Sequence, residues 1–158
     1  MSISIDEYWM QQALHLAQEA GKHQEVPIGA ILVKQDKVIG QGFNQPIGSH
    51  DPTAHAEILA LRDAAQNQGN YRLVDSTLYV TIEPCAMCAG ALVHARVSRL
   101  VFGALEPKAG AVVSQTNQLD GDHLNHCVKY EGGVCAEACA SIVSVFFARR
   151  RREKCNRR

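Results

Sequence analysis

The stretch TLYVTIEPCAMCAGALVHA, residues 77–95, determines how the rest of the chain can be arranged. Its first part, residues 77–82, is rich in β-branched and aromatic side chains and predicts a strand. Pro84 suits the first position of a helix, because its missing N–H would have no partner there, and this helix can run to about Ala95. A further strand is expected at residues 100–102. Strand, helix and strand in this order predict a parallel crossover that covers one face of a sheet.

The flanking sequence predicts further elements. Ser4 and Glu7 have the spacing of a capping box, and apolar residues then recur at helical spacing as far as Gly21. Residues 44–53 and 106–121 are rich in turn-forming residues and predict loops. The remaining elements are strands at 28–33 and 38–43, a helix at about 54–68, a strand at 127–130 and a helix from 135 to about 152. The first two strands predict a hairpin, so the expected fold class is α/β with a mixed five-stranded sheet.

Size and composition favour one compact unit. The chain has 158 residues, of which 46% are hydrophobic and 20% are charged. We therefore expect a single domain over residues 1–158. No apolar run approaches the roughly 18 to 20 residues that a membrane-spanning helix needs. The first ten residues carry Asp6 and Glu7 and have no apolar core, unlike a secretory signal. The sequence predicts a cytoplasmic protein without a membrane partner.

The formal net charge of zero conceals an uneven distribution. Residues 149–158 contain seven basic residues and one acidic residue, a net charge of +6, so residues 1–148 carry −6. A basic helix or tail over about 146–158 has two interpretations. It can be a solvated helix end whose cations complement the helix dipole, or a surface that binds phosphates.

Three residues have the spacing of a metal site. His55 precedes Cys85 by 30 residues, and Cys88 follows three positions later. Residues three apart on a helix share a face, so both sulfurs can reach one ion. One imidazole and two thiolates suit Zn²⁺, which prefers four ligands in a tetrahedron, and leave one position for water. An open position of this kind is what catalysis requires.

Glu57 is the right type of group to move protons at such a site. Residues two apart on a regular helix point to nearly opposite sides. His55 and Glu57 can therefore converge only if His55 lies at the irregular start of its helix.

The other four cysteines leave alternatives open. A structural zinc site would need a fourth protein ligand, and the candidates are Cys127, Cys135, Cys139 and Cys155. Cys135 and Cys139 lie four apart, so with Cys127 they could face a second ion. Burial of Cys135 and Cys139 as small hydrophobic residues is the preferred interpretation.

The motifs resemble those of the zinc-dependent nucleobase deaminases, the cytidine and deoxycytidylate deaminase superfamily. The similarity extends along nearly the whole chain and is greatest to the members that act on adenosine in tRNA. The matching segments are Gly42-Phe43-Asn44, residues 50–57 with His55-Ala56-Glu57, residues 70–73, and residues 81–88 with Pro84-Cys85-Ala86-Met87-Cys88. This resemblance implies a three-layer α/β/α fold, a homodimer, and one Zn²⁺ per subunit held by His55, Cys85 and Cys88, with Glu57 as the catalytic acid and base.

The same resemblance implies a substrate: the wobble adenosine of an arginine tRNA, converted to inosine within the anticodon stem-loop. Asn44 matches a residue that contacts the purine. Glu106 stands where the family usually has Asp, which accepts a hydrogen bond from a ribose hydroxyl. The longer Glu side chain keeps this acceptor but moves it by one methylene. Asn125 matches a further pocket position. Phe147, beside Phe146 and the arginines, is expected to contact RNA, since aromatic faces with cations suit unpaired bases.

Two other functions remain open on sequence grounds. The same metal chemistry could deaminate a free nucleobase or nucleotide, such as guanine or deoxycytidylate. Alternatively, the chain could be a non-catalytic RNA-binding module with a structural zinc. The latter would leave Glu57 without a role.

Overall fold

The computed structural model describes residues 2–158, and its helices and strands follow the predicted order. The elements are α1 (Ile5–Lys22), β1 (Gly29–Lys34), β2 (Lys37–Phe43), α2 (Ala56–Gln68), β3 (Thr77–Ile82), α3 (Ala86–His94), β4 (Arg99–Ala104), a 3₁₀ turn (Gln118–Asp120), β5 (Lys129–Glu131) and α4 (Ala136–Asn156). The capping box that opens α1 is formed, with the N–H of Glu7 donating to the Ser4 hydroxyl at 3.1 Å.

The five strands form one mixed sheet in the order β2-β1-β3-β4-β5. β1 pairs antiparallel with β2 and with β3, whereas β3, β4 and β5 run parallel. The predicted hairpin and the predicted crossover through α3 are both present. A mixed five-stranded sheet is confirmed.

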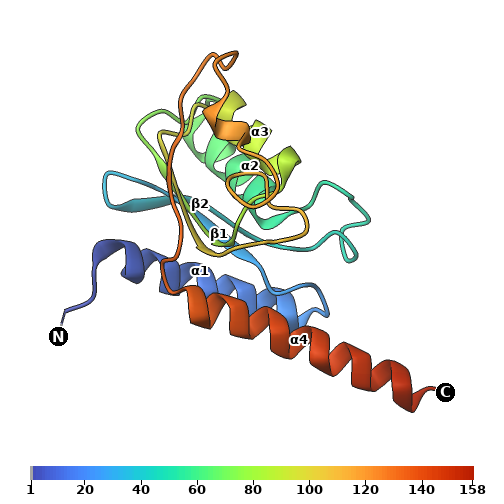
Figure 1. The fold of residues 1–158 in the computed structure, drawn as a ribbon. Helices are drawn as coiled ribbons and strands as arrows, with labels where there is room; N and C mark the ends of the chain where they lie inside the picture. Colours follow the sequence, from blue (N-terminus) through green and yellow to red (C-terminus); the bar gives the residue numbers. More distant parts are fainter. Residues whose placement is uncertain (1) are drawn as a thin grey trace.

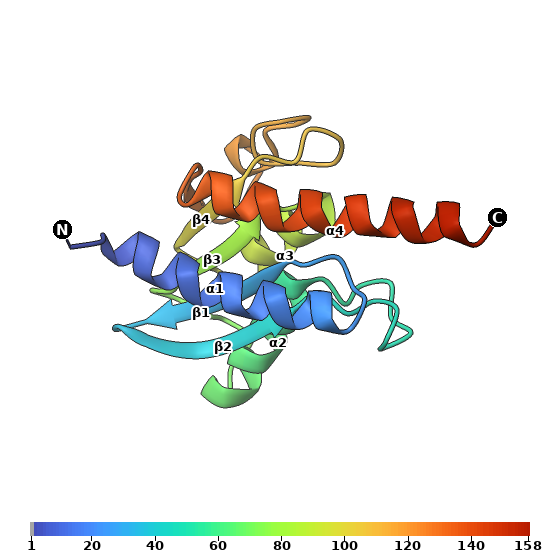
Figure 2. The ribbon, with the colours of Figure 1, turned by 90° about the horizontal axis from the view of Figure 1, so that it is seen from below.

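Helices cover both faces of the sheet, as Figures 1 and 2 show. Along β1, Ala30 and Leu32 pack with the cluster that includes α2 and α3. The alternate residues Ile31 and Val33 pack with the cluster that includes α1 and α4. Because successive side chains of a strand point to opposite faces, β1 contributes to both halves of the core. The expected α/β/α layering is therefore correct.

α4 packs closely against β4. A Cβ atom added at Gly103 would overlap the sulfur of Cys139, and this sulfur belongs to a side chain with no exposed surface. The interpretation as a buried hydrophobic residue is thus confirmed for Cys139 and wrong for Cys135, which is only partly buried. The glycine permits the close approach of helix and strand.

The last turns of α4 leave the body of the molecule. The helix ends at Asn156, four residues beyond the expected end, and every residue from 149 to 158 is exposed. Figures 1 and 2 show this end running past the sheet. Arg149 and Glu153, four residues apart, form an ion pair at 3.8 Å that favours the helix in this segment. In the part of the chain that the structure describes, no helix combines the length and apolar character needed to span a bilayer.

Candidate metal and catalytic site

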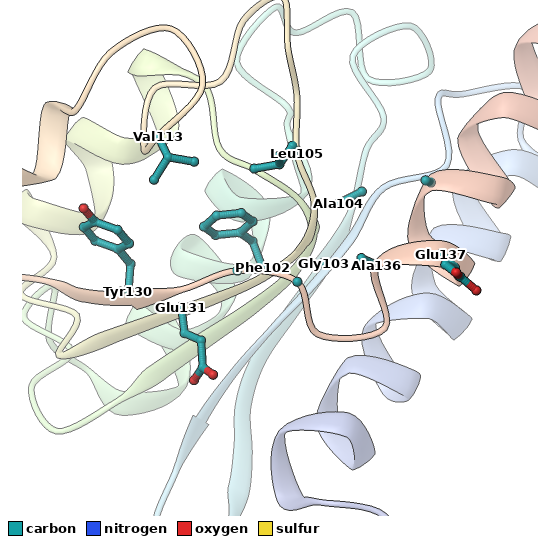
Figure 3. Close-up of a pocket in the computed structure, with 12 residues that line it drawn as sticks. Phe102, Gly103, Ala104, Leu105, Val113, Tyr130, Glu131, Ala136 and Glu137 are labelled. Atoms are coloured by element: carbon teal, nitrogen blue, oxygen red, sulfur yellow. The ribbon is translucent and has the colours of Figure 1, made fainter.

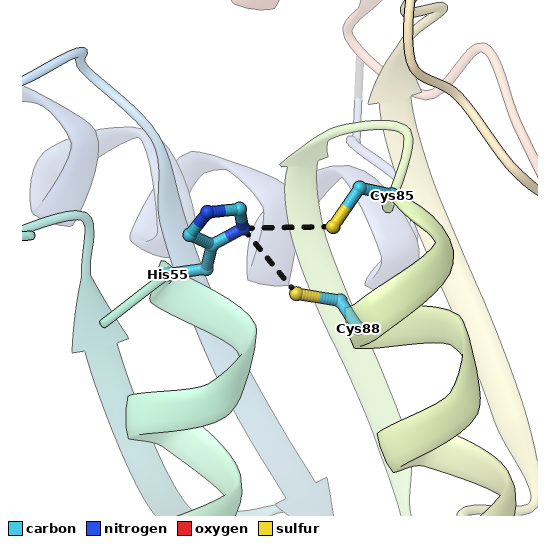
Figure 4. A group of neighbouring side chains, drawn as sticks. All are labelled: His55, Cys85 and Cys88. Carbon is cyan, nitrogen blue, oxygen red and sulfur yellow. Dashed lines mark hydrogen bonds between the residues drawn. The ribbon is translucent and has the colours of Figure 1, made fainter. Parts of the chain in front are cut away.

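Three side chains meet where α2 and α3 begin. The Nδ1 atom of His55 lies 3.6 Å from the sulfur of Cys85 and 3.6 Å from the sulfur of Cys88. Figure 4 shows the imidazole facing both sulfurs across the gap between the two helices. Among residues 2–158, this is the group of His, Cys, Asp and Glu side chains that could hold a metal ion.

The two helix starts bring these residues together. His55 is the N-cap of α2 and has extended backbone angles, φ −74° and ψ 152°. Cys85 is the N-cap of α3 and is also extended. Both helices begin two residues later than the sequence predicts, because the metal-binding residue of each occupies the cap position. The expectation that His55 lies at the irregular start of its helix is therefore confirmed.

The spacing of the three donor atoms fits zinc. With Zn–S near 2.3 Å and Zn–N near 2.0–2.1 Å, a tetrahedral centre separates sulfur from nitrogen by about 3.6 Å. Both His55–cysteine separations in the structure have this value. The three side chains provide three of the four ligands that Zn²⁺ prefers, the number found at catalytic sites where water is the fourth ligand.

The environment of the group favours a negatively charged sulfur. Its interactions with Cys88 and with His55 lower the pKa of Cys85 to about 3, despite partial burial. The hydrogen bond with Cys85, together with burial, raises the pKa of Cys88. The hydrogen bond with Cys85 also raises the pKa of His55. A thiolate at a helix N-terminus faces unpaired N–H groups, which stabilise it and keep it available as a ligand.

Glu57 lies in the first turn of α2 and is only 4% exposed. Burial raises the pKa of its carboxyl group, and interactions with Cys88 and His55 act in the opposite direction. The carboxyl group is thus next to the metal-binding group. A raised pKa suits a residue that must both accept and release a proton.

Asn44 and Glu106 follow strands β2 and β4, and each lies near a segment that leads to a metal-binding residue. Asn44 follows β2 and is buried, and its neighbour Gln45 donates to the carbonyl of Ala54 at 3.0 Å, beside His55. Glu106 follows β4, and its backbone N–H donates to Glu83 at 3.1 Å, two residues before Cys85. The segments that carry Asn44 and Glu106 are thus hydrogen-bonded to the segments that lead to His55 and Cys85, and contacts of the two side chains with substrate stay predictions.

Asn125 and Phe147 lie elsewhere. Asn125 is exposed in a surface hollow lined by residues 119–122 and 124–128, to which no metal-binding residue contributes. Phe147 is 43% exposed on α4 and packs edge-on against the buried Phe146, over which Arg149 and Arg150 lie. Contacts of these two residues with substrate stay predictions.

A large apolar cavity is separate from the metal-binding group. It has a volume of roughly 690 Å³ and lies between β4, β5 and the start of α4 (Figure 3). Phe102, Leu105 and Tyr130 give it a largely apolar lining. None of the three metal-binding residues borders it, so cavity size does not locate the candidate site.

Two buried glutamates near the site were not predicted. Glu25 accepts the N–H groups of Ile47 and Gly48 in the loop that leads to His55. Glu83 is 3% exposed and accepts four N–H groups from the loop after β4. Although burial acts to raise it, the pKa of Glu83 is lowered to about 2 by these hydrogen bonds and by the Ser114 hydroxyl. A charged residue directly after the apolar strand 77–82 was the signal available in the sequence.

The site and the fold define a class of protein. Residues 3–104 match the model of the cytidine and deoxycytidylate deaminase zinc-binding region. This segment contains the strands β1 to β4, both helix starts and all three metal-binding residues. The chain belongs to the cytidine and deoxycytidylate deaminase family, and zinc is its metal.

Individual relatives are more specific. The chain is 51% identical to the tRNA-specific adenosine deaminase of Haemophilus influenzae, over 95% of this chain and 87% of the relative. A solved structure from a study of A-to-I editing by tRNA:A34 deaminases at the wobble position is 41% identical, with a TM-score of 0.83, over 85% of this chain and 98% of that one. The guanine deaminase of Bacillus subtilis is 38% identical with a TM-score of 0.61, over 65% and 66%. The resemblance to the tRNA-adenosine branch is confirmed.

Proposed function

We propose that this protein is a zinc-dependent hydrolytic deaminase that converts adenosine at the wobble position of an arginine tRNA to inosine. The observation that carries the proposal is the group of His55, Cys85 and Cys88, which offers three zinc ligands, with the buried Glu57 beside it. The near-full-length similarity to tRNA-specific adenosine deaminases supports the choice of substrate.

The proposed chemistry assigns the proton transfers to Glu57. His55, Cys85 and Cys88 would hold the zinc, which when bound would lower the pKa of a coordinated water to about 7. Glu57 accepts a proton as the oxygen of this water bonds to C6 of adenine, and delivers that proton to the ring nitrogen N1. A second proton from the water goes through Glu57 to the amino group. The C6–N bond then breaks, N1 keeps its proton, and the products are inosine and ammonia.

The target base has to leave its stack to reach this site, because Glu57 and Cys88 are buried. An unpaired base of an anticodon loop meets this requirement at low cost. We assign Asn44 to the purine and Glu106 to the ribose. The hydrogen bonds that join their segments to those of His55 and Cys85 support this assignment. Asn125 and Phe147 are assigned to flanking nucleotides.

The basic end of α4 is our candidate for phosphate contacts in the anticodon stem-loop. Its cations are exposed, and Phe147 presents an aromatic face next to them. Truncation after Ala148 should weaken tRNA binding and flatten its salt dependence, while zinc content stays the same. Equal affinity and equal salt dependence of the truncated protein would contradict this assignment.

Three further proposals rest on the family resemblance. Residues 1–158 form a single deaminase domain, the protein is a homodimer with one zinc per subunit, and it works in the cytoplasm. Sedimentation equilibrium of the zinc-loaded protein tests the dimer by its mass. Microscopy of a tagged chain in its host tests the compartment.

A rival function is deamination of a free base, which the similarity to guanine deaminase favours. The deciding experiment incubates zinc-loaded protein with arginine tRNA that has adenosine at the wobble position, and in parallel with adenosine, guanine and deoxycytidylate. Inosine at that one position, with the small molecules unchanged, would support our proposal. Turnover of guanine or deoxycytidylate without editing of tRNA would refute it and keep only the zinc chemistry.

A further inference from the structure

The carboxylate of Glu83 is surrounded by one loop. It accepts N–H groups from Glu106, Val112, Val113 and Ser114 at 2.9 to 3.1 Å, and it also accepts the Ser114 hydroxyl. Among residues 2–158 no cation forms an ion pair with Glu83. A buried charge is costly unless hydrogen bonds compensate it, so the loop must keep the one shape that directs these N–H groups inward.

The backbone also closes over the carboxylate at Gly110. A Cβ atom there would come within 2.5 Å of both Glu83 oxygens. Gly110 is therefore required by the close approach of its backbone, since any side chain would displace the carboxylate.

The same loop is joined to the segment that carries Cys85. The N–H of Ala111 donates to the carbonyl of Pro84 at 2.9 Å, and the side-chain amide of Gln118 donates to the carbonyl of Ala86 at 2.9 Å. Glu83, Pro84 and Ala86, which flank Cys85 in the sequence, thus each accept a hydrogen bond from residues 106–118. The spacing between the loop and Cys85 is fixed by these bonds.

We propose that Glu83 is a positioning residue that holds residues 105–114 as one wall of the substrate pocket at a set distance from the metal. Glu83 touches neither metal nor substrate and acts through the loop, above all through Glu106, whose backbone it binds directly. The part of this inference that concerns substrate rests on the proposed function. Loss of the carboxylate then loosens the wall and weakens substrate binding, while the metal-binding group and the proton transfers by Glu57 continue.

Glu83→Gln tests this with little change in shape. Its NH₂ group would point at N–H donors, so the amide cannot replace both oxygens. In hydrogen-exchange mass spectrometry we expect faster exchange in residues 106–114 and unchanged exchange in α2 and α3. We expect the KM to rise about tenfold or more, the effect of losing one charge-assisted hydrogen bond, and kcat and zinc content to stay close to wild type.

Two sets of controls separate positioning from general stability. Ser114→Ala removes one hydrogen bond to Glu83 and should show a smaller increase in KM and in loop exchange. Ser114→Thr keeps the hydroxyl and should behave like wild type. Asp6→Asn removes a carboxylate that binds Arg99 and Tyr79 at the opposite end of the sheet. It should lower stability without a change in KM or in exchange of the loop.

The outcomes are distinguishable from those of the proposed function. The KM is measured with whichever substrate of the panel above the wild-type protein turns over, and hydrogen exchange needs no substrate. Failure to edit tRNA would refute the proposed function but leave the exchange result to decide the role of Glu83. The inference would be overturned if residues 106–114 of Glu83→Gln exchanged hydrogen as slowly as in wild type. It would also be overturned if they exchanged faster while the KM stayed unchanged. Loss of zinc in this variant would overturn it too.

Discussion

The carboxylate of Glu25 accepts the backbone N–H of Gly48 at 2.7 Å, and so joins the end of α1 to the middle of the loop that leads to His55. Its other oxygen accepts the N–H of Ile47 at 3.1 Å, and the side chain is 1% exposed. This loop also carries Asn44 at its start. A carboxylate distant in sequence thus shapes the segment between two predicted functional residues.

Glu25→Ala should lower the free energy of unfolding by about 1 to 3 kcal/mol, because it removes two charge-assisted hydrogen bonds. Urea unfolding followed by circular dichroism measures the change. The matched control is Glu19→Ala on α1. The Glu19 carboxylate is solvent-exposed and pairs only with Lys22, so this substitution should leave stability close to wild type. Equal effects of the two substitutions would show that Glu25 does not hold the loop.

Glu57→Gln should abolish deamination and preserve the site. The amide has the shape of the carboxyl group but cannot accept and return a proton, so we expect a loss of about 10²- to 10⁴-fold in kcat. Zinc content and affinity for tRNA should remain. Undiminished deamination would remove Glu57 as acid and base. Loss of activity with binding retained would argue against a module that only binds RNA.

Cys88→Ser should reduce zinc affinity by about 100-fold or more, since even residues that only support metal ligands typically contribute 10- to 100-fold. Metal analysis after dialysis against a weak chelator provides the measurement. Cys127→Ser is the matched control, because Cys127 is exposed and lies outside the metal-binding group. Removal of zinc from wild type by a strong chelator should lower its melting temperature. Full zinc content in Cys88→Ser would refute the assignment of this ligand.

Acid should weaken the link between α1 and the sheet. Hydrogen bonds from Arg99 hold the pKa of Asp6 below its ordinary value of 3.8. A lowered folded-state pKa means that Asp6 stabilises the fold above about pH 3.8, and that this contribution is lost as the pH falls through the lowered value. The stability difference between wild type and Asp6→Asn, measured by urea unfolding from pH 7 to pH 3, should therefore shrink at the acidic end. Asp122→Asn, at an exposed position, should show no such trend.

The order of elements and the metal-binding group were predictable because both depend on local signals. The capping box of α1, the strand at 77–82 and the Cys85–Cys88 spacing each reflect a short stretch of chain. The apolar run of β1 was also visible, although not which face of the sheet each side chain would take.

Other features depend on pairs far apart in the sequence. The bonds from Glu83 to Val112 and Ser114 span 29 and 31 residues, and no local pattern predicts them. The helix starts differ from the predicted ones for a similar reason. Propensity alone places His55 and Cys85 inside their helices, whereas in the structure both are N-caps and the helices begin at Ala56 and Ala86. Even so, the extended backbone of His55 could be anticipated, because a ligand and a proton carrier two residues apart require it.

The free end of α4 has an evolutionary consequence. Residues 149–158 are exposed throughout, whereas the metal-binding side chains and Glu57 lie at the starts of α2 and α3. Substitutions can therefore add or remove basic residues in this segment without a compensating change in the core. Selection can therefore adjust the affinity for a polyanion independently of the reaction rate. Substitutions in the terminal helix are enough to change the affinity.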